Sequence, residues 1–377
     1  MNYKAWADEK WEKAVVKLRA EAERHTNEIP YIPGEDGMYT DMVASGRASW
    51  WTNGFWGGMM WLMYQGTKEE IFAQTARNSE KLLDQVLAKH SCLDHDVGFL
   101  WHITAGANYR LNGDEEGKNR ALLAASMLAS RFNDAGRFIR AWNGPWNGED
   151  THGWAIIDCM MNIPLLYWAS RELDDDRFKY IAMAHADTTM ENHVRPDGSV
   201  NHIMVYDHKN GGVLGVKGGQ GYDENSAWSR GQAWAIYGFV LSYIHTGKKE
   251  YLDTAKKVAN FFIASVCDDW LPKSDLIAPE EPVIYDTSAG TCAACGMLEI
   301  AKCVPENEGR KYVRAAMNIL MAIEERFCDW NPSKDSIVQM GSELYHVNGN
   351  PHRALIYADY FFVEALYKIK ELGPLFW

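Results

Sequence analysis

Helical hairpins that recur along the chain constrain its fold more than any other feature. Apolar residues follow the 3.6-residue period of an α-helix through most of the sequence, and strand-like alternation is scarce. Successive helices meet at short polar turns, where glycine ends the first helix and acidic residues favour the start of the second. The predicted helices span residues 4–24, 53–65, 68–89, 98–111, 115–132, 153–171, 175–192, 228–246, 249–266, 288–303, 308–328 and 354–370.

The two helices of a hairpin differ in composition. The helix before a turn is the more apolar and the richer in glycine, as in 54–64, whereas the helix after it carries charged residues on one side, as in 68–89. A helix that is apolar all round belongs inside a protein, and one with a charged face belongs outside. The alternation predicts an all-α fold, a closed (α/α)6 barrel that residues 1–377 form as a single domain. An open solenoid of helical hairpins is the alternative.

Long connections precede the inner helices, and they are rich in Gly, Trp, His, Asn and Pro. Loops of this length inside a compact domain are usually functional. In a closed ring they would gather at one end and form a pocket there. The 16 Trp, 18 Tyr and 13 Phe of the chain supply flat apolar faces that suit sugar rings. These connections are residues 25–52, 133–152, 193–227, 267–287 and 329–353.

Charge and cysteine content narrow the function classes. A net charge of −13 argues against nucleic acid and anionic membranes as partners. The charged N-terminal segment does not resemble a secretory signal, and no run of about 18 apolar residues suggests a membrane span, so a cytoplasmic protein is expected. Cys292-Ala-Ala-Cys295 lies in a helical pattern without further ligands at zinc spacing. No metal or other cofactor is therefore predicted.

Two aspartates are the candidate catalytic groups. Asp158 is the only formally charged residue between Asp150 and Arg171, and its apolar neighbours disfavour the ionised form, as a general acid requires. A buried aspartate satisfied by backbone N–H groups or an arginine is the alternative. Asp96 precedes another inner helix and could equally be its N-cap, as could Asp94. Two carboxyl groups beside one sugar can divide labour, one protonated and one charged.

Aromatic and polar residues accompany these aspartates. The starts of two inner helices, 51–56 and 228–234, resemble each other and direct aromatic faces towards one end of the barrel. His202, Gln220 and Arg230 lie on or beside the 193–227 loop and could hold an anion, for which arginine is well suited. The alternatives are an ordinary loop histidine at 202 and an ion pair of Arg230 with Asp223 or Glu224.

Taken together, these motifs resemble the unsaturated glucuronyl hydrolases of glycoside hydrolase family 88. The resemblance runs in order from about residue 50 to the end of the chain. It implies an (α/α)6 barrel without a metal that acts in the cytoplasm. The implied reaction removes the 4,5-unsaturated uronic acid from the non-reducing end of oligosaccharides left by polysaccharide lyases. The segments that carry the resemblance are 51–56, 95–100, 156–166, Gln220 with 228–234, and 345–347.

The resemblance also assigns roles by position. It makes Asp158 the general acid and base and Asp96 the second catalytic carboxylate. Asn53 stands where some relatives are expected to carry Asp, and 348–353 replaces a Ser-x-Ser-x-Lys stretch associated with sulfated substrates, which leaves the parent polymer open. A monomer or weak homodimer is expected. The implied substrate-binding residues are Trp51, Phe55, His95, Trp142, His202, Gln220, Arg230, Trp234 and Tyr345.

Other functions fit parts of the pattern. An unsaturated rhamnogalacturonyl hydrolase acting on pectin fragments would share the fold and the chemistry. An ordinary inverting glycosidase would cleave saturated glucuronides, and a sugar epimerase would rely on a pair of histidines rather than on Asp158. A helical scaffold protein would not gather Trp, Arg and Asp at one end of a ring.

Overall fold

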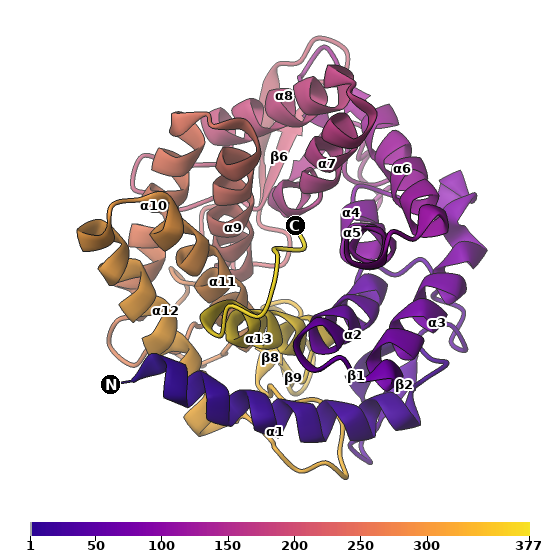
Figure 1. The fold of residues 1–377 in the computed structure, drawn as a ribbon. Helices are drawn as coiled ribbons and strands as arrows, with labels where there is room; N and C mark the ends of the chain where they lie inside the picture. The colour runs from indigo at the N-terminus through magenta and orange to yellow at the C-terminus, as the bar shows by residue number, and fades with distance from the viewer. Residues whose placement is uncertain (1) are drawn as a thin grey trace.

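The computed structural model describes residues 2–377, whose helices form two concentric rings (Figure 1). The inner ring comprises α2 (Asn53–Thr67), α4 (Val97–Trp101) with α5 (Ala105–Asn112), α7 (Pro164–Leu173), α9 (Ser229–Thr246), α11 (Thr287–Cys303) and α13 (Ile356–Ile369). The outer ring comprises α1 (Tyr3–Arg24), α3 (Glu70–Leu87), α6 (Glu115–Ser130), α8 (Asp176–Asn192), α10 (Lys249–Val266) and α12 (Glu306–Phe327).

Burial distinguishes the two rings as their composition predicts. In α11 every residue from Thr287 to Ile300 is buried, whereas α3 buries only a stripe that includes Phe72, Ala76 and Leu83. A helix of the first kind must be surrounded by protein, and one of the second kind covers it. The predicted inner and outer positions are therefore confirmed.

The inner ring closes on itself. The last inner helix, α13, packs against both α11 and α2, and α1 covers α13 from outside. At the α2–α13 contact the ring of Phe55 lies 5.2 Å from that of Tyr360 and 5.7 Å from that of Phe361. The predicted (α/α)6 barrel is confirmed, and the open solenoid is excluded because its terminal helices would not meet.

The predicted helix 153–171 is wrong in its first half. This segment forms β5 (Trp154–Ile156) and the 3-10 turn η2 (Ile157–Met161), and α7 begins only at Pro164. β5 pairs antiparallel with β6 (Ile203–Tyr206), which pairs with β7 (Val213–Lys217). A short buried strand is as apolar as a helix, so periodicity did not distinguish them. Proline lacks the N–H that an earlier helical turn would need and therefore starts α7.

A second predicted helix, 98–111, is interrupted. It divides into α4 and α5 at Thr104, whose φ of −102° and ψ of −95° are not helical. The helices predicted elsewhere are present, with ends that shift by a few residues.

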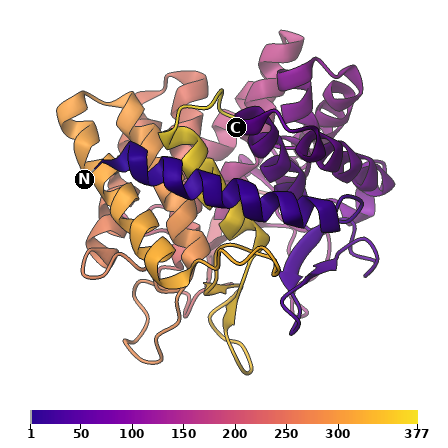
Figure 2. The same cartoon turned by 60° about the horizontal axis from the view of Figure 1, so that its bottom comes forward.

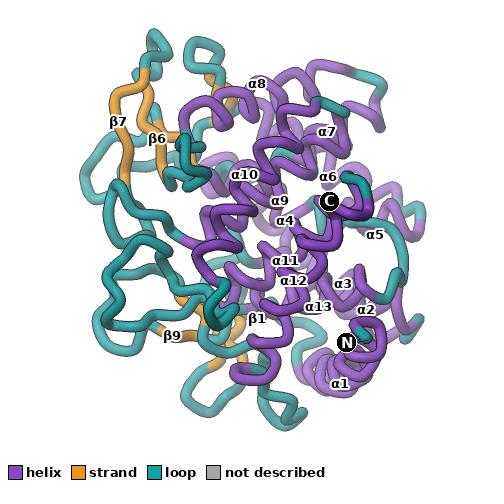
Figure 3. The backbone as a smooth tube through the Cα atoms, turned by 90° about the vertical axis from the view of Figure 1, so that its left-hand side faces the viewer, coloured by secondary structure: helices purple, strands orange, loops and turns teal. Residues whose placement is uncertain are grey.

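The long connections lie at one end of the barrel. Figure 2 shows them below the helices, and Figure 3 shows the loops gathered on one side together with β6, β7 and β9. This confirms the predicted position of the loops. At the other end the C-terminal segment returns over the ring, where Phe376 and Trp377 are buried. The short strands of the loop end are β1 (Pro30–Pro33), β2 (Tyr39–Asp41), β3 (Phe132–Asn133), β4 (Phe138–Ile139), β8 (Gly341–Ser342) and β9 (His352–Arg353).

The side chains of Cys292 and Cys295 are buried in α11, and the Cys295 thiol donates a hydrogen bond to the carbonyl of Phe361 at 3.1 Å. Among residues 2–377, every helix is too short or too polar to cross a bilayer.

Candidate active site

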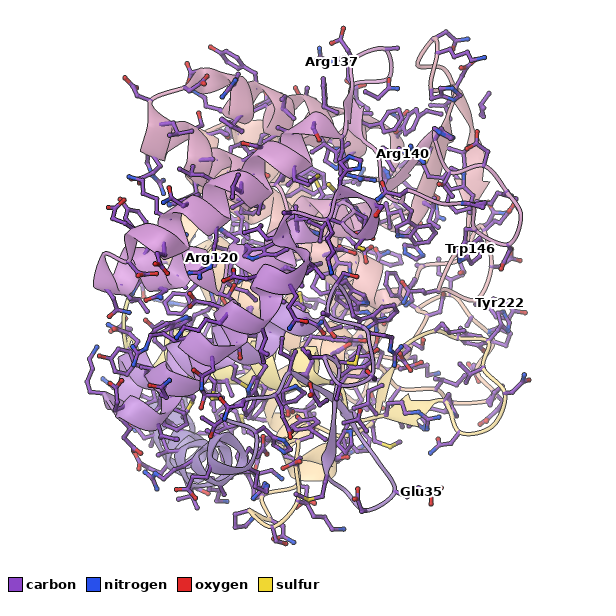
Figure 4. All side chains as sticks on the ribbon, turned by 90° about the vertical axis from the view of Figure 1, so that its right-hand side faces the viewer. Glu35, Arg120, Arg137, Arg140, Trp146 and Tyr222 are labelled. Atoms are coloured by element: carbon purple, nitrogen blue, oxygen red, sulfur yellow. The ribbon has the colours of Figure 1, made fainter. Side chains whose placement is uncertain are left out.

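A cavity of about 630 Å³ opens among the loops, and most of the predicted site residues line it. Side chains from the starts of the inner helices and from the long connections line it together. Figure 4 shows Trp146, one of the lining residues, on the loop side of the molecule with Tyr222. The predicted residues in its wall are Trp51, His95, Asp96, Trp142, Asp158, His202 and Gln220.

The β5–β6 pairing places Asp158 beside His202. Ile156 pairs with Ile203, and the N–H of Ile157 donates to the carbonyl of His202 at 3.1 Å. The carboxylate Oδ2 of Asp158 lies 3.6 Å from His202 Nε2, an ion-pair distance that is too long for a hydrogen bond. Neither of these two buried atoms has a hydrogen-bond partner among the described residues. Both therefore remain available to a ligand in the cavity.

Asp96 stands at the N-cap position of α4 but its side chain does not cap that helix. Its Oδ1 accepts a hydrogen bond from the Asn162 amide at 3.1 Å, and its Oδ2 lies 3.6 Å from His95 Nε2. Asp94 accepts from the N–H of Asp96 at 2.9 Å and so braces the turn. The geometry favours a role in the cavity over the capping role that the sequence left open.

Asn162 connects the two aspartates and was not identified from the sequence. Besides its bond to Asp96, its amide donates to the carbonyl of Asp158 at 3.2 Å, and its oxygen accepts from the N–H of Phe99 at 2.8 Å. Gly98 permits this contact, since a Cβ there would lie 2.6 Å from the Asn162 Cα. In the sequence, Asn162 could have been noticed as the single polar amide side chain in the otherwise apolar run that follows Asp158.

The two carboxyl groups have opposite pKa shifts. Burial raises the pKa of Asp96 well above its usual range, and the negative charges of Asp94 and Asp158 add to this effect. Burial also acts to raise the pKa of Asp158, but it is outweighed by His202, by His95 and by Arg230, so that the pKa is lowered. The expected raised pKa at Asp158 is wrong, because the apolar neighbours in the sequence did not reveal the nearby histidines. Interacting carboxyl groups titrate as a pair, and this pair holds one proton over the range between its two pKa values.

Arg230 is buried beside the cavity and does not line it. Its guanidinium pairs with Asp286 at 2.5 Å and donates to the carbonyls of Ser342 and Glu343 at 2.6 and 2.9 Å. The guanidinium also lies 4.5 Å from the centre of the Trp228 ring. The ion pair considered from the sequence is present, with Asp286 as the partner in place of Asp223 or Glu224. The predicted contact with a substrate stays a prediction.

Three other predicted residues lie outside the cavity wall. Trp234 is fully buried, 5.3 Å from the ring of Phe99, and Phe55 is 6.0 Å from the ring of Trp51. Both support the aromatic wall from behind. Tyr345 packs 5.0 Å from the ring of Tyr222, and its hydroxyl has no partner among residues 2–377.

Tyr31 and Glu343 also line the cavity, and neither was predicted from the sequence. Tyr31 donates a hydrogen bond to Glu343 at 2.5 Å and so joins two of the long connections.

Asn53, whose role was left open, donates hydrogen bonds to the carbonyls of Arg47 and Ala48, both at 2.9 Å. Its amide therefore holds a loop in place, a role that a carboxylate could not perform because it cannot donate.

Residues 31–321 match the family model described as Glycosyl Hydrolase Family 88. The chain belongs to this family. Among the relatives of this family 88 hydrolase is an unsaturated glucuronyl hydrolase of Bacillus sp. (strain GL1), 35% identical over 336 residues, which cover 87% of this chain and 88% of the relative. An unsaturated chondroitin disaccharide hydrolase of Streptococcus pneumoniae is 33% identical, with coverages of 87% and 83%. The solved structure of an unsaturated glucuronyl hydrolase from Streptococcus agalactiae superposes with a TM-score of 0.90 at 29% identity, covering 99% of this chain and 94% of that one.

Proposed function

We propose that this family 88 hydrolase removes a 4,5-unsaturated glucuronic acid from the non-reducing end of oligosaccharides that polysaccharide lyases release. The observation that carries the proposal is the pair of carboxyl groups, Asp96 and Asp158, which have little exposure and line a cavity with tryptophan walls. The names of the relatives support the substrate class. A cavity of about 630 Å³ lies within the range that binds a small oligosaccharide.

The unsaturated uronate is a vinyl ether, and its chemistry begins with a proton transfer. Asp158 donates a proton to C4, which places positive charge on C5 and the ring oxygen. A water molecule then attacks C5 and returns a proton to the Asp158 carboxylate. Because the carboxyl pair holds one proton, the reactive form can carry it on Asp158 even though Asp96 holds it more strongly in the free enzyme.

The hydration product releases the second sugar without further help from the enzyme. It is a hemiketal at C5, whose ring opens to a C5 ketone and a hemiacetal at C1. The hemiacetal expels the aglycone alcohol and leaves an aldehyde at C1, so that one water molecule is consumed in total. No covalent glycosyl–enzyme bond is needed, and no step requires a metal.

Absorbance of the C4=C5 bond tests the proposal. Unsaturated disaccharides from chondroitin, hyaluronan, heparin, gellan and pectin should lose this absorbance as the aglycone appears, while saturated glucuronides remain intact. Cleavage of saturated glucuronides would instead indicate an ordinary inverting glycosidase. Preference for the pectin fragments would indicate an unsaturated rhamnogalacturonyl hydrolase.

We also propose that residues 1–377 act as one catalytic domain in the cytoplasm, as a monomer or weak homodimer. A continuous core that extends from Ala7 to Trp377 supports the first point. The net charge of −13 supports the expectation that neither nucleic acid nor a membrane is a partner. Sedimentation analysis and cell fractionation test the oligomeric state and the location.

A further inference from the structure

One wall of the cavity mouth is the 46–50 turn, Gly46–Trp50, which carries polar groups that the proposed reaction does not use. Arg47, Ser49 and Trp50 of this turn line the cavity. Arg47 is exposed, whereas Asp96 and Asp158 lie at the floor with little exposure. The turn therefore meets the part of a ligand that projects from the floor towards solvent.

The side-chain donors of this turn have no partners among residues 2–377. None of the ion pairs or side-chain hydrogen bonds among residues 2–377 involves the guanidinium of Arg47 or the hydroxyl of Ser49. The indole N–H of Trp50 is buried and also unpartnered. The guanidinium lies 5.3 Å from the centre of the Trp50 ring. A guanidinium stacked on an aromatic face keeps its N–H edge available for two parallel hydrogen bonds.

The backbone of Arg47 is fixed before any ligand arrives. Its N–H donates to the carbonyl of Met42 at 2.8 Å, and its carbonyl accepts from the N–H of Trp50 at 3.0 Å and from Asn53 at 2.9 Å. Asn53 is itself fully buried at the start of α2. The cation is thus mounted on a rigid support, which reduces the entropy lost when it binds.

The charge of Arg47 contrasts with its surroundings. The other lining residues include the acids Asp94, Asp96, Asp158 and Glu343. An anionic group at the mouth would meet repulsion from these acids unless a local cation compensated for it. Arg47 is the arginine in the cavity wall and is placed to do so.

We propose that the 46–50 turn binds an oxyanion on the sugar that follows the unsaturated uronate, either a sulfate ester or a carboxylate. This inference rests on the proposed function, because the uronate must occupy the floor for the next sugar to reach the turn. Arg47 would supply a charge-assisted bidentate contact, and Ser49 and Trp50 would supply further donors.

Steady-state kinetics of Arg47→Gln on matched substrates tests the proposal. The substrates are unsaturated chondroitin disaccharides without sulfate, with 4-sulfate and with 6-sulfate, and an unsulfated unsaturated digalacturonate, whose second sugar carries a carboxylate. We expect KM for an oxyanion-bearing substrate to rise about 10-fold, the effect of one charge-assisted hydrogen bond, with kcat nearly unchanged. KM for the unsulfated chondroitin disaccharide should stay constant, and Arg47→Lys should restore part of the loss.

The substrate that responds identifies the ligand. A rise in KM confined to a sulfated chondroitin disaccharide assigns a sulfate ester, and a rise confined to the digalacturonate assigns a carboxylate. An equal rise for every substrate would overturn the proposal, because Arg47 would then bind the uronate itself. Unchanged KM for all four substrates would overturn it as well.

Arg137→Gln is the matched control, since Arg137 is exposed and lies outside the cavity wall (Figure 4). It removes the same charge and should leave all four KM values unchanged. The same selectivity in this variant would attribute the effect to overall charge and contradict a binding turn. If the wild-type enzyme turned over none of the unsaturated substrates, the proposed function would fail, whereas an active enzyme indifferent to Arg47 would overturn only this inference.

Discussion

At the scale of single residues, Asp158 is the group on which turnover depends. Replacement by asparagine keeps its volume but removes the proton that C4 receives, so kcat for an unsaturated disaccharide should fall about 10²- to 10⁴-fold. Absorbance decay measures this loss, and thermal unfolding should show that the fold persists. Asp150→Asn is the control, because Asp150 is an exposed carboxylate that pairs with His152 outside the cavity. Full turnover by Asp158→Asn would exclude its proposed role.

Asp96 should determine the pH dependence. The singly protonated pair is lost as pH rises through the raised pKa associated with Asp96, so kcat/KM should decline on the alkaline side. In Asp96→Asn the remaining carboxyl, Asp158, has a lowered pKa and is protonated only at more acidic pH. The alkaline limb of the residual activity should therefore move to lower pH. A limb that stays in place would belong to another titrating group.

The residues that could be predicted from sequence were those with a local signal. Asp158 was identified by its apolar neighbours, and Asp96 by its place before an inner helix. Asn162 and Arg47 were missed because their importance depends on contacts with segments distant in sequence, Asn162 with Asp96 and Phe99. The direction of the pKa shift at Asp158 was wrong for the same reason, since His202 reaches it only through the β5–β6 pairing.

At the scale of elements, the close approach of α2 and α4 positions Asp96. A Cβ on Gly54 would lie 1.9 Å from the carbonyl oxygen of Phe99, so Gly54→Ala must separate the two helices. We expect the free energy of unfolding to fall by about 1–3 kcal/mol, as for other overpacked cores, and kcat to fall with it. Urea unfolding and absorbance decay measure the two effects. Gly215→Ala is the control, because a Cβ there meets nothing within 4 Å; equal behaviour of the two variants would contradict the argument.

Arg230 ties the start of α9 to the start of α11 through Asp286. Arg230→Ala would leave a buried carboxylate without its partner and should lower the free energy of unfolding by about 3–5 kcal/mol. Adding Asp286→Asn should recover part of this stability, since no unpaired charge would remain. Urea unfolding of both variants checks this; a single variant as stable as the wild type would show that the pair is not needed.

The elements were predictable where the pattern is long and amphipathic. Helices such as α10 and α12 were found almost to the residue, because a charged face and an apolar face recur over several turns. The strand β5 and the turn η2 were not, because three buried apolar residues fit a strand and a helix equally well.

At the scale of the whole molecule, the hairpin repeat predicted a closed ring, but not what fills its other end. Trp377 stacks 6.3 Å from the ring of Phe361, and its indole donates to Glu364 at 3.0 Å. Trp377→Ala should lower the free energy of unfolding by about 3–5 kcal/mol through the cavity that it creates. At temperatures well below the transition kcat should change little, because the loops that line the cavity lie at the opposite end of the barrel (Figure 2). Thermal unfolding and kinetics test this, and a large loss of kcat without a loss of stability would contradict it.

The closure of the helical ring could be predicted from the composition of the inner helices, because each of these apolar helices needs neighbours on every side. The side-by-side contact of α2 and α13, far apart in sequence, was implied only by that closure.

The central claim is that hydrolysis proceeds by protonation of C4, and turnover in D₂O tests it most directly. Following an unsaturated disaccharide by absorbance and by NMR, we expect the loss of C4=C5, release of the aglycone and one deuterium at C4 to occur together. An aglycone released while the double bond and its absorbance persist would contradict the account.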